Sequence, residues 1–343
     1  MPSPPSHVHR GDRPSLPGEV LVVWALLAVV TIEILATYTR TPAAELYYVS
    51  GSGFRLAVHQ ALLFVGFPVG LVAIAVAGLS VDRIPNRLAV LASAVVASLG
   101  AVAFFSNGGE EAEVDVRAVS MLALAGVAIA LALGLTAAGH AGITRRRGAM
   151  PGDRTRLAVA VFVGLLGIPW LLADLGISTD QIPLLNHVFI SEALRPDPGR
   201  PKAFSAVHDG HHHGMDGVLL VWSALLLTRT LPTISGRRLR AAVGPYIALI
   251  MVFGLANALQ DFWTEQLVKR GVVSWELPRF TKISADPKWF ALLIIAAVVY
   301  VLTMRPGGPL ARAHAPFRRS EPHGARDAEL GTKVPHPDGP SAR

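Results

Sequence analysis

The sequence contains no cysteine among its 343 residues. This absence excludes disulfide scaffolds, iron-sulfur clusters, thiolate zinc sites and thiol nucleophiles, so any bound metal must use nitrogen or oxygen ligands. Charged residues are also scarce, at 16%, whereas soluble domains carry roughly 25%. Together with 52% hydrophobic residues, this scarcity excludes an ordinary soluble globular protein.

Long apolar runs take the place of the missing charge. A membrane-spanning helix needs about 17–25 predominantly apolar residues, and such stretches predict an all-α, polytopic bundle of about eight transmembrane helices. We expect one domain over residues 20–304, with disordered tails at 1–19 and 305–343, where apolar periodicity is lost. The predicted spans are 20–38, 57–79, 88–105, 118–139, 157–177, 216–232, 241–262 and 288–304.

The formal net charge of +7 is explained by membrane topology. Basic residues are densest in the loops at 140–156 and 229–240, and basic loops remain on the cytoplasmic side. This distribution predicts cytoplasmic termini, a multi-pass location in the plasma (inner) membrane of a bacterial cell, and the lipid bilayer as the main partner. It gives no indication of a nucleic-acid partner or of an oligomeric state.

Ionisable residues inside the predicted spans are few and one-sided. Glu33, His59, Asp174, Asp216 and Asp261 all fall near the extracytoplasmic ends, whereas the inner ends are apolar and closed by arginines. Each such residue costs about 2.5–3.5 kcal/mol at the bilayer centre and is therefore a functional candidate. The asymmetry indicates a pocket open to the outside and argues against a path across the membrane.

A histidine-rich segment leads directly into the sixth predicted span. In a helix, His208, His212 and Asp216 are spaced at i, i+4 and i+8, so their side chains project from one face about 6 Å apart. Two nitrogen ligands and one oxygen ligand suit a divalent metal, zinc more than iron. The third imidazole is expected from among His211, His213, His59 and His187.

Residues 208–212, with the sequence HDGHH, resemble two known motifs. They are similar to the H-E-x-x-H motif of zincins, with Asp in place of Glu, which implies zinc and hydrolysis. They also resemble the H-x-x-H-H box of membrane di-iron desaturases and hydroxylases, which implies iron and oxidation. One such segment assigns the chain to neither family.

These features predict a membrane metalloenzyme as the first hypothesis. Asp261, Glu33 or Asp174 would act as general base or last metal ligand, and a lipid or other amphiphile would be the substrate. Hydrolysis is the first choice of reaction and oxidation the second. Two other classes stay open: a transporter or metal-handling permease, and a non-catalytic protein whose histidines sense pH.

Smaller signals predict how the spans bend and pack. Gly66 and Gly70 form a G-x-x-x-G pattern that permits close helix packing. The amphipathic stretch 184–194 predicts an interfacial helix that could cover the outer pocket. Kinks are expected at Pro68, Pro169 and Pro245.

Overall fold

The structure is a computed structural model that describes residues 14–41, 53–106, 118–144, 148–196, 203–207, 213–280 and 285–305. Within these ranges the chain is mainly helical, and six helical stretches are long and apolar enough to cross a membrane. The protein is therefore a multi-pass membrane protein. The stretches are α1 (Gly18–Arg40), α2 (Gly53–Phe64) continuing through η2 (Val65–Val69) into α3 (Gly70–Val81), α4 (Arg87–Ser106), α5 (Ala118–Ala141), α10 (Arg237–Trp263) continuing into η6 (Thr264–Val268), and α11 (Pro287–Val299) continuing into η7 (Tyr300–Met304).

Two of the eight predicted spans differ from a long straight helix. The fifth is divided into α6 (Asp153–Leu166) and α7 (Ile168–Asp174), which meet at an angle of 55°. Gly167 lies at the break and Pro169 follows it in the first turn of α7, where a proline is tolerated. The sixth is the shorter helix α9 (His213–Thr228), of 16 residues. The structure thus supports six long apolar helices, or seven if the bent pair forms one span.

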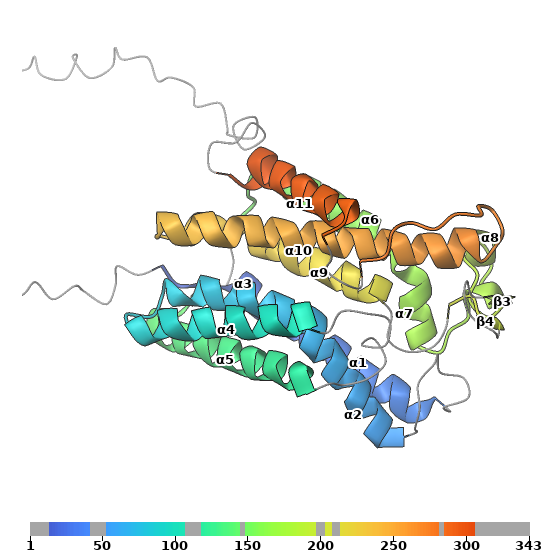
Figure 1. The fold of residues 1–343 in the computed structure, drawn as a ribbon, viewed down its shortest axis with the longest axis horizontal. Coiled ribbons are helices and arrows are strands. Elements are labelled where there is room, and N and C mark those ends of the chain that lie inside the picture. The colour runs from blue at the N-terminus through green and yellow to red at the C-terminus, as the bar shows by residue number, and fades with distance from the viewer. Residues whose placement is uncertain are drawn as a thin grey trace, which may run out of the picture.

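The bundle is organised around α10, which lies beside α9 along most of the length of α9 (Figure 1). Two glycines allow this close approach. A Cβ added at Gly217 would overlap the carbonyl oxygen of Gly254 and lie 2.7 Å from the backbone nitrogen of Ala258. Backbone atoms cannot move aside as a flexible side chain can, so the α9–α10 crossing depends on the absence of a side chain at Gly217.

Helices α3, α4 and α5 pack together as a second group (Figure 1). The predicted glycine pattern lies at the contact with α5, because Gly66 faces Ser120 and Gly70 faces Ala123, both at 3.6 Å from an added Cβ. Pro68 lies within the π-helical turn η2, whereas Pro245 is accommodated inside α10. A proline and a π-turn are recognised causes of bends in long helices.

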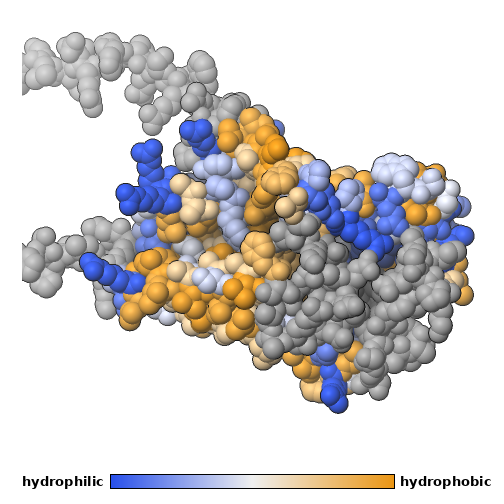
Figure 2. Space-filling model, viewed as in Figure 1, coloured by the Kyte–Doolittle hydropathy of each residue, from blue (hydrophilic) through white to orange (hydrophobic). Residues whose placement is uncertain are grey.

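Large apolar side chains remain exposed on the outward faces of the bundle, as Figure 2 shows over α4, α5 and α11. Phe290 and Ile294 on α11 are 58% and 63% exposed, and Leu88 on α4 is 66% exposed. Exposed apolar area on this scale is unusual for a soluble monomer, but it is the expected surface of helices whose solvent is lipid.

The prediction of an interfacial helix over residues 184–194 is wrong. Only one helical turn forms there, α8 (Leu185–Val188), and the chain is extended from Phe189 onward. Short strands follow, with β3 (Leu194–Pro196) antiparallel to β4 (Ala203–Ser205). The extended form is held from outside the segment, because the side chain of Gln266 bonds both the N–H and the C=O of Ile190, each at 2.9 Å.

The helical region also begins slightly earlier than predicted. Helix α1 starts at Gly18, and the preceding strand β1 (Leu16–Pro17) pairs in parallel with β2 (Ile143–Thr144). Leu16 is buried, so this short pairing belongs to the core. The rest of the predicted tails, residues 1–13 and 306–343, lies outside the described residues.

Candidate functional site

One end of the bundle combines a helix start, a helix end and a buried tryptophan. We call this region the histidine end; it comprises α7, the first turn of α9, and α10 from Asn257 through η6 to Lys269. Gly214 lies directly against the Trp170 ring, which an added Cβ would overlap. The Trp170 Nε1–H donates to Glu265 Oε2 at 2.6 Å, and both side chains are buried. The tryptophan thus joins α7, α9 and α10.

Asp261 holds the start of α9 from a neighbouring helix. Its Oδ2 accepts the backbone N–H of Gly214 at 2.7 Å, a group that α9 itself cannot satisfy in its first turn. His213, Lys269 and Arg279 lie near this carboxylate. Oδ1 accepts no hydrogen bond from the described residues, which leaves it available as a ligand or a base.

Glu33 and Asp174 are brought together through Thr37. The Thr37 hydroxyl lies 2.5 Å from Glu33 Oε1 and 3.0 Å from the backbone carbonyl oxygen of Asp174. Arg40 donates to the same carbonyl oxygen. The C-terminal part of α1 is therefore attached to the end of α7, where the Asp174 side chain is 5% exposed.

Two polar side chains fix the loops around the histidine end: Lys269, directly after η6, and Asp180, in the 3₁₀ turn η4 (Thr179–Gln181). Lys269 donates to the carbonyl oxygen of Ala206 at 3.1 Å, just before the histidine segment. Asp180 accepts the N–H of Glu192 at 2.6 Å, and Ser191 donates its N–H to the same carboxylate. These contacts position the chain on both sides of α8.

The predicted metal ligands fall into three groups: two at the start of α9, two on other helices, and three outside the described residues. His213 is the first residue of α9, and Asp216, one turn further, is 1% exposed. His59 is half-buried on α2, which packs beside α1, and His187 is exposed on α8. His208, His211 and His212 lie outside the described residues.

Among the described residues, no group of three histidine or carboxylate side chains is arranged to hold a metal. A three-ligand centre at the start of α9 must therefore draw on the part of the histidine segment that lies outside those ranges. The structure leaves the predicted ligand set untested and defines the helix start into which that segment leads.

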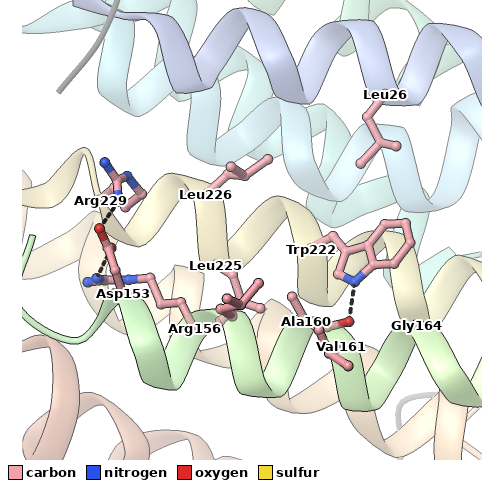
Figure 3. Close-up of a pocket in the computed structure, with 11 residues that line it drawn as sticks. Leu26, Asp153, Arg156, Ala160, Val161, Gly164, Trp222, Leu225, Leu226 and Arg229 are labelled. Carbon is pink, nitrogen blue, oxygen red and sulfur yellow. Dashed lines mark hydrogen bonds and ion pairs between the residues drawn. The ribbon is translucent and has the colours of Figure 1, made fainter. Parts of the chain in front are cut away.

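The opposite end of the bundle contains ion pairs between arginines and acidic residues that lie just outside the predicted spans. We call it the arginine end; it comprises the starts of α1 and α6 and the turn after α9. Arg229 bonds Glu19 Oε1 at 3.1 Å and also pairs with Asp153, which in turn accepts from Arg156 Nη1 at 2.9 Å (Figure 3). Opposite charges from α1, α6 and the turn after α9 pair there. The sequence of each span alone does not reveal this pairing.

A fully buried cation lies in the turn between α3 and α4. Arg83 is buried in the turn after α3 and donates to Thr233 Oγ1 at 2.7 Å. Its neighbour Asp82 accepts the N–H groups of Ser235 and Gly236, at 2.6 and 3.3 Å, immediately before α10 begins. Asp82 therefore fixes the start of α10, as Asp261 fixes the start of α9.

Sequence reasoning missed Trp170, Thr37 and Lys269. For Lys269 a signal was present, because it continues the four-residue spacing of Asp261 and Glu265 along the same helix. Trp170 and Thr37 carry no comparable signal, since their importance comes from contacts with residues 95 and 137 positions away.

The helices and their exposed apolar faces define a multi-pass helical membrane protein with polar clusters at both ends. No protein-family model, curated protein or solved structure matches the chain.

Proposed function

We propose that the protein is a metal-dependent membrane enzyme that hydrolyses a lipid or another amphiphile at the histidine end. In this proposal α6 with α7 forms the fifth span and α9 the sixth, which makes eight. Both termini are then cytoplasmic, and the histidine end faces the outside of the plasma membrane.

The start of α9 is the observation that carries the proposal. The histidine segment enters α9 at His213, Asp261 anchors the next residue, and Asp216 is buried one turn further along. Imidazole nitrogen and carboxylate oxygen are the ligands that zinc takes in the absence of cysteine. This arrangement supports a metal held by His208, His212 and Asp216, with zinc preferred to iron, and with a remaining ligand from His211, His213, His59 or His187.

The proposed chemistry is hydrolysis of an ester of the substrate. A metal held at this site would supply a water that ionises near neutral pH. A carboxylate would take the proton of that water and return it to the leaving alcohol as the bond to the acyl or phosphoryl group breaks. Asp261 Oδ1 is the first choice for this base, because its Oδ2 already fixes the carboxylate beside α9. Glu33 and Asp174, joined through Thr37, are the alternatives.

Metal content tests the first half of the proposal. Protein purified without a histidine tag is analysed by elemental mass spectrometry as wild type, as a His208→Ala, His212→Ala double variant and as His140→Ala. His140 is exposed near the end of α5 and serves as the matched control. We expect about one zinc per chain in wild type and in the control, and its loss from the double variant. Equal metal in all three proteins would overturn the proposal.

Turnover tests the second half. Wild type and Asp261→Asn are incubated with mixed phospholipid vesicles, and released products are identified by mass spectrometry. The amide can still accept the Gly214 N–H but cannot take a proton, so Asp261→Asn should retain its metal and lose about 100-fold in rate. Equal rates in both proteins would exclude Asp261 as the base, and metal without lipid products would exclude the hydrolase.

A further inference from the structure

A cavity of about 630 Å³ opens on the side of the arginine end, between α1, α6 and α9 (Figure 3). Its size is within the range of roughly 300–1,000 Å³ that is usual for ligand pockets. Leu157 and Val161 line it and are 65% and 52% exposed, so it opens onto an apolar outer face of α6. We refer to it as the α6 groove.

The α6 groove is apolar along its length and charged at one end. Leu26, Leu225 and Leu226 form its walls, and Asp153, Arg156 and Arg229 lie together at the end nearest the start of α6 (Figure 3). Trp222 donates its Nε1–H to the carbonyl oxygen of Ala160 at 2.9 Å. Because that donor is occupied, Trp222 offers only its ring to the groove.

Arg156 has unused hydrogen-bonding capacity at the charged end. Its Nε donates to Thr228 Oγ1 at 2.8 Å, and its Nη1 donates to Asp153 and to the carbonyl oxygen of Pro151, both at 2.9 Å. Nη2 donates no hydrogen bond within the part of the chain that the structure describes. Three contacts hold the guanidinium plane, so the open Nη2 is a fixed donor.

We propose that the α6 groove binds an anionic phospholipid, with one acyl chain along the apolar walls and the phosphate on Arg156 Nη2. An apolar cavity offers water too few partners, and its mouth lies on a face whose surrounding solvent is acyl chain. A guanidinium matches phosphate in geometry and charge. From Asp153 to Gly164 the groove follows α6 for about 17 Å, at 1.5 Å per residue, which accommodates much of an acyl chain.

Native mass spectrometry with defined lipids tests this site. Purified protein in detergent is titrated with phosphatidylglycerol or with diacylglycerol of the same acyl chains, for wild type, Arg156→Gln and Arg154→Gln. Arg154 is the matched control, because it is basic, exposed and two residues away. We expect wild type to bind one phosphatidylglycerol about tenfold more tightly than diacylglycerol, and Arg156→Gln alone to lose that preference.

A second pair of variants tests the same site without requiring that Arg156→Gln folds. Val161→Trp narrows the mouth of the α6 groove, whereas Phe162→Trp changes an equally exposed neighbour that does not line it. Only Val161→Trp should lose the bound lipid. Added inorganic phosphate should not displace the lipid, since it has no chain to bury. Equal loss in Arg154→Gln and Arg156→Gln, unchanged binding in Val161→Trp, or displacement by phosphate would overturn the proposal.

Discussion

The two ends of the bundle handle buried charge in opposite ways. At the arginine end, Arg229 and Arg156 pair with Glu19 and Asp153, so positive and negative groups balance within the protein. At the histidine end, Glu265 accepts the Trp170 indole N–H and Asp261 accepts the Gly214 backbone N–H. Ion pairs thus join helices at the arginine end, and hydrogen bonds from neutral N–H groups to carboxylates join them at the histidine end.

The difference shows why counting ionisable residues per span is insufficient. Both ends contain polar groups at helix ends, and each has an aspartate that accepts backbone N–H groups at the start of another helix. What distinguishes them is which partners the tertiary structure supplies. The predictions below test that distinction, beginning with the contact on which the histidine end most depends.

The largest effect is expected for Gly217→Ala. The new Cβ would overlap the Gly254 carbonyl, so α9 and α10 must separate, at a cost of about 3 kcal/mol. Unfolding in mixed detergent micelles measures this cost. Gly139→Ala is the control, because nothing lies within 4 Å of its added Cβ; it should be neutral or stabilising by up to about 1 kcal/mol. Similar losses in both variants would show that the crossing is not tight.

The same substitution can be made at Trp170 in the histidine end and at Trp222 in the interior of α9. Trp170→Phe removes a donor from the buried Glu265 carboxylate and should cost about 2 kcal/mol. Trp222→Phe removes a hydrogen bond to the neutral Ala160 carbonyl and should cost about 1 kcal/mol. Unfolding free energies of both variants test the order. A larger loss for Trp222→Phe would contradict the view that charge at the histidine end depends on Trp170.

A smaller effect is expected for Asp261→Ala. The variant leaves the Gly214 N–H without its acceptor and should lose about 1 kcal/mol, as removal of a helix cap does. Asp261→Asn retains an acceptor oxygen and should lose less. Hydrogen exchange at the first turn of α9 reports the effect locally. Equal exchange in the two variants would mean that Asp261 does not hold the helix start.

The smallest effect is expected at the arginine end for Glu19→Gln. Arg229 keeps its pairing with Asp153, and both side chains of the altered pair are partly exposed, so the loss should be about 0.5 kcal/mol and should shrink with added salt. Unfolding at low and high ionic strength measures it. A loss as large as that of Trp170→Phe would mean that the arginine end depends on this one ion pair.

The sequence predicts the helices because long apolar runs are a local property. Each of the eight predicted stretches overlaps a helix of the structure, and the break at Gly167 is consistent with the neighbouring Pro169. Composition alone does not determine the number of spans, because α9 is short and the α6–α7 pair bends by 55°.

The contacts of the candidate site are not predictable in the same way. Glu33, Asp174 and Asp261 were found because ionisable residues stand out in apolar spans. Their partners Thr37 and Gly214 have no such contrast, and their contacts depend on how helices far apart in sequence pack. The ion pairs of the arginine end were not predicted for the same reason, since Glu19 and Arg229 are 210 residues apart.

Zinc titration of two matched variants tests the central contrast most directly. Asp216→Asn and Asp153→Asn each neutralise one aspartate in the first turn of a helix, at the histidine end and the arginine end respectively. Isothermal calorimetry on metal-free protein should show one tight zinc site in wild type and in Asp153→Asn, and a loss of at least about tenfold in affinity for Asp216→Asn. Equal affinity in all three proteins, or no binding in wild type, would contradict the account.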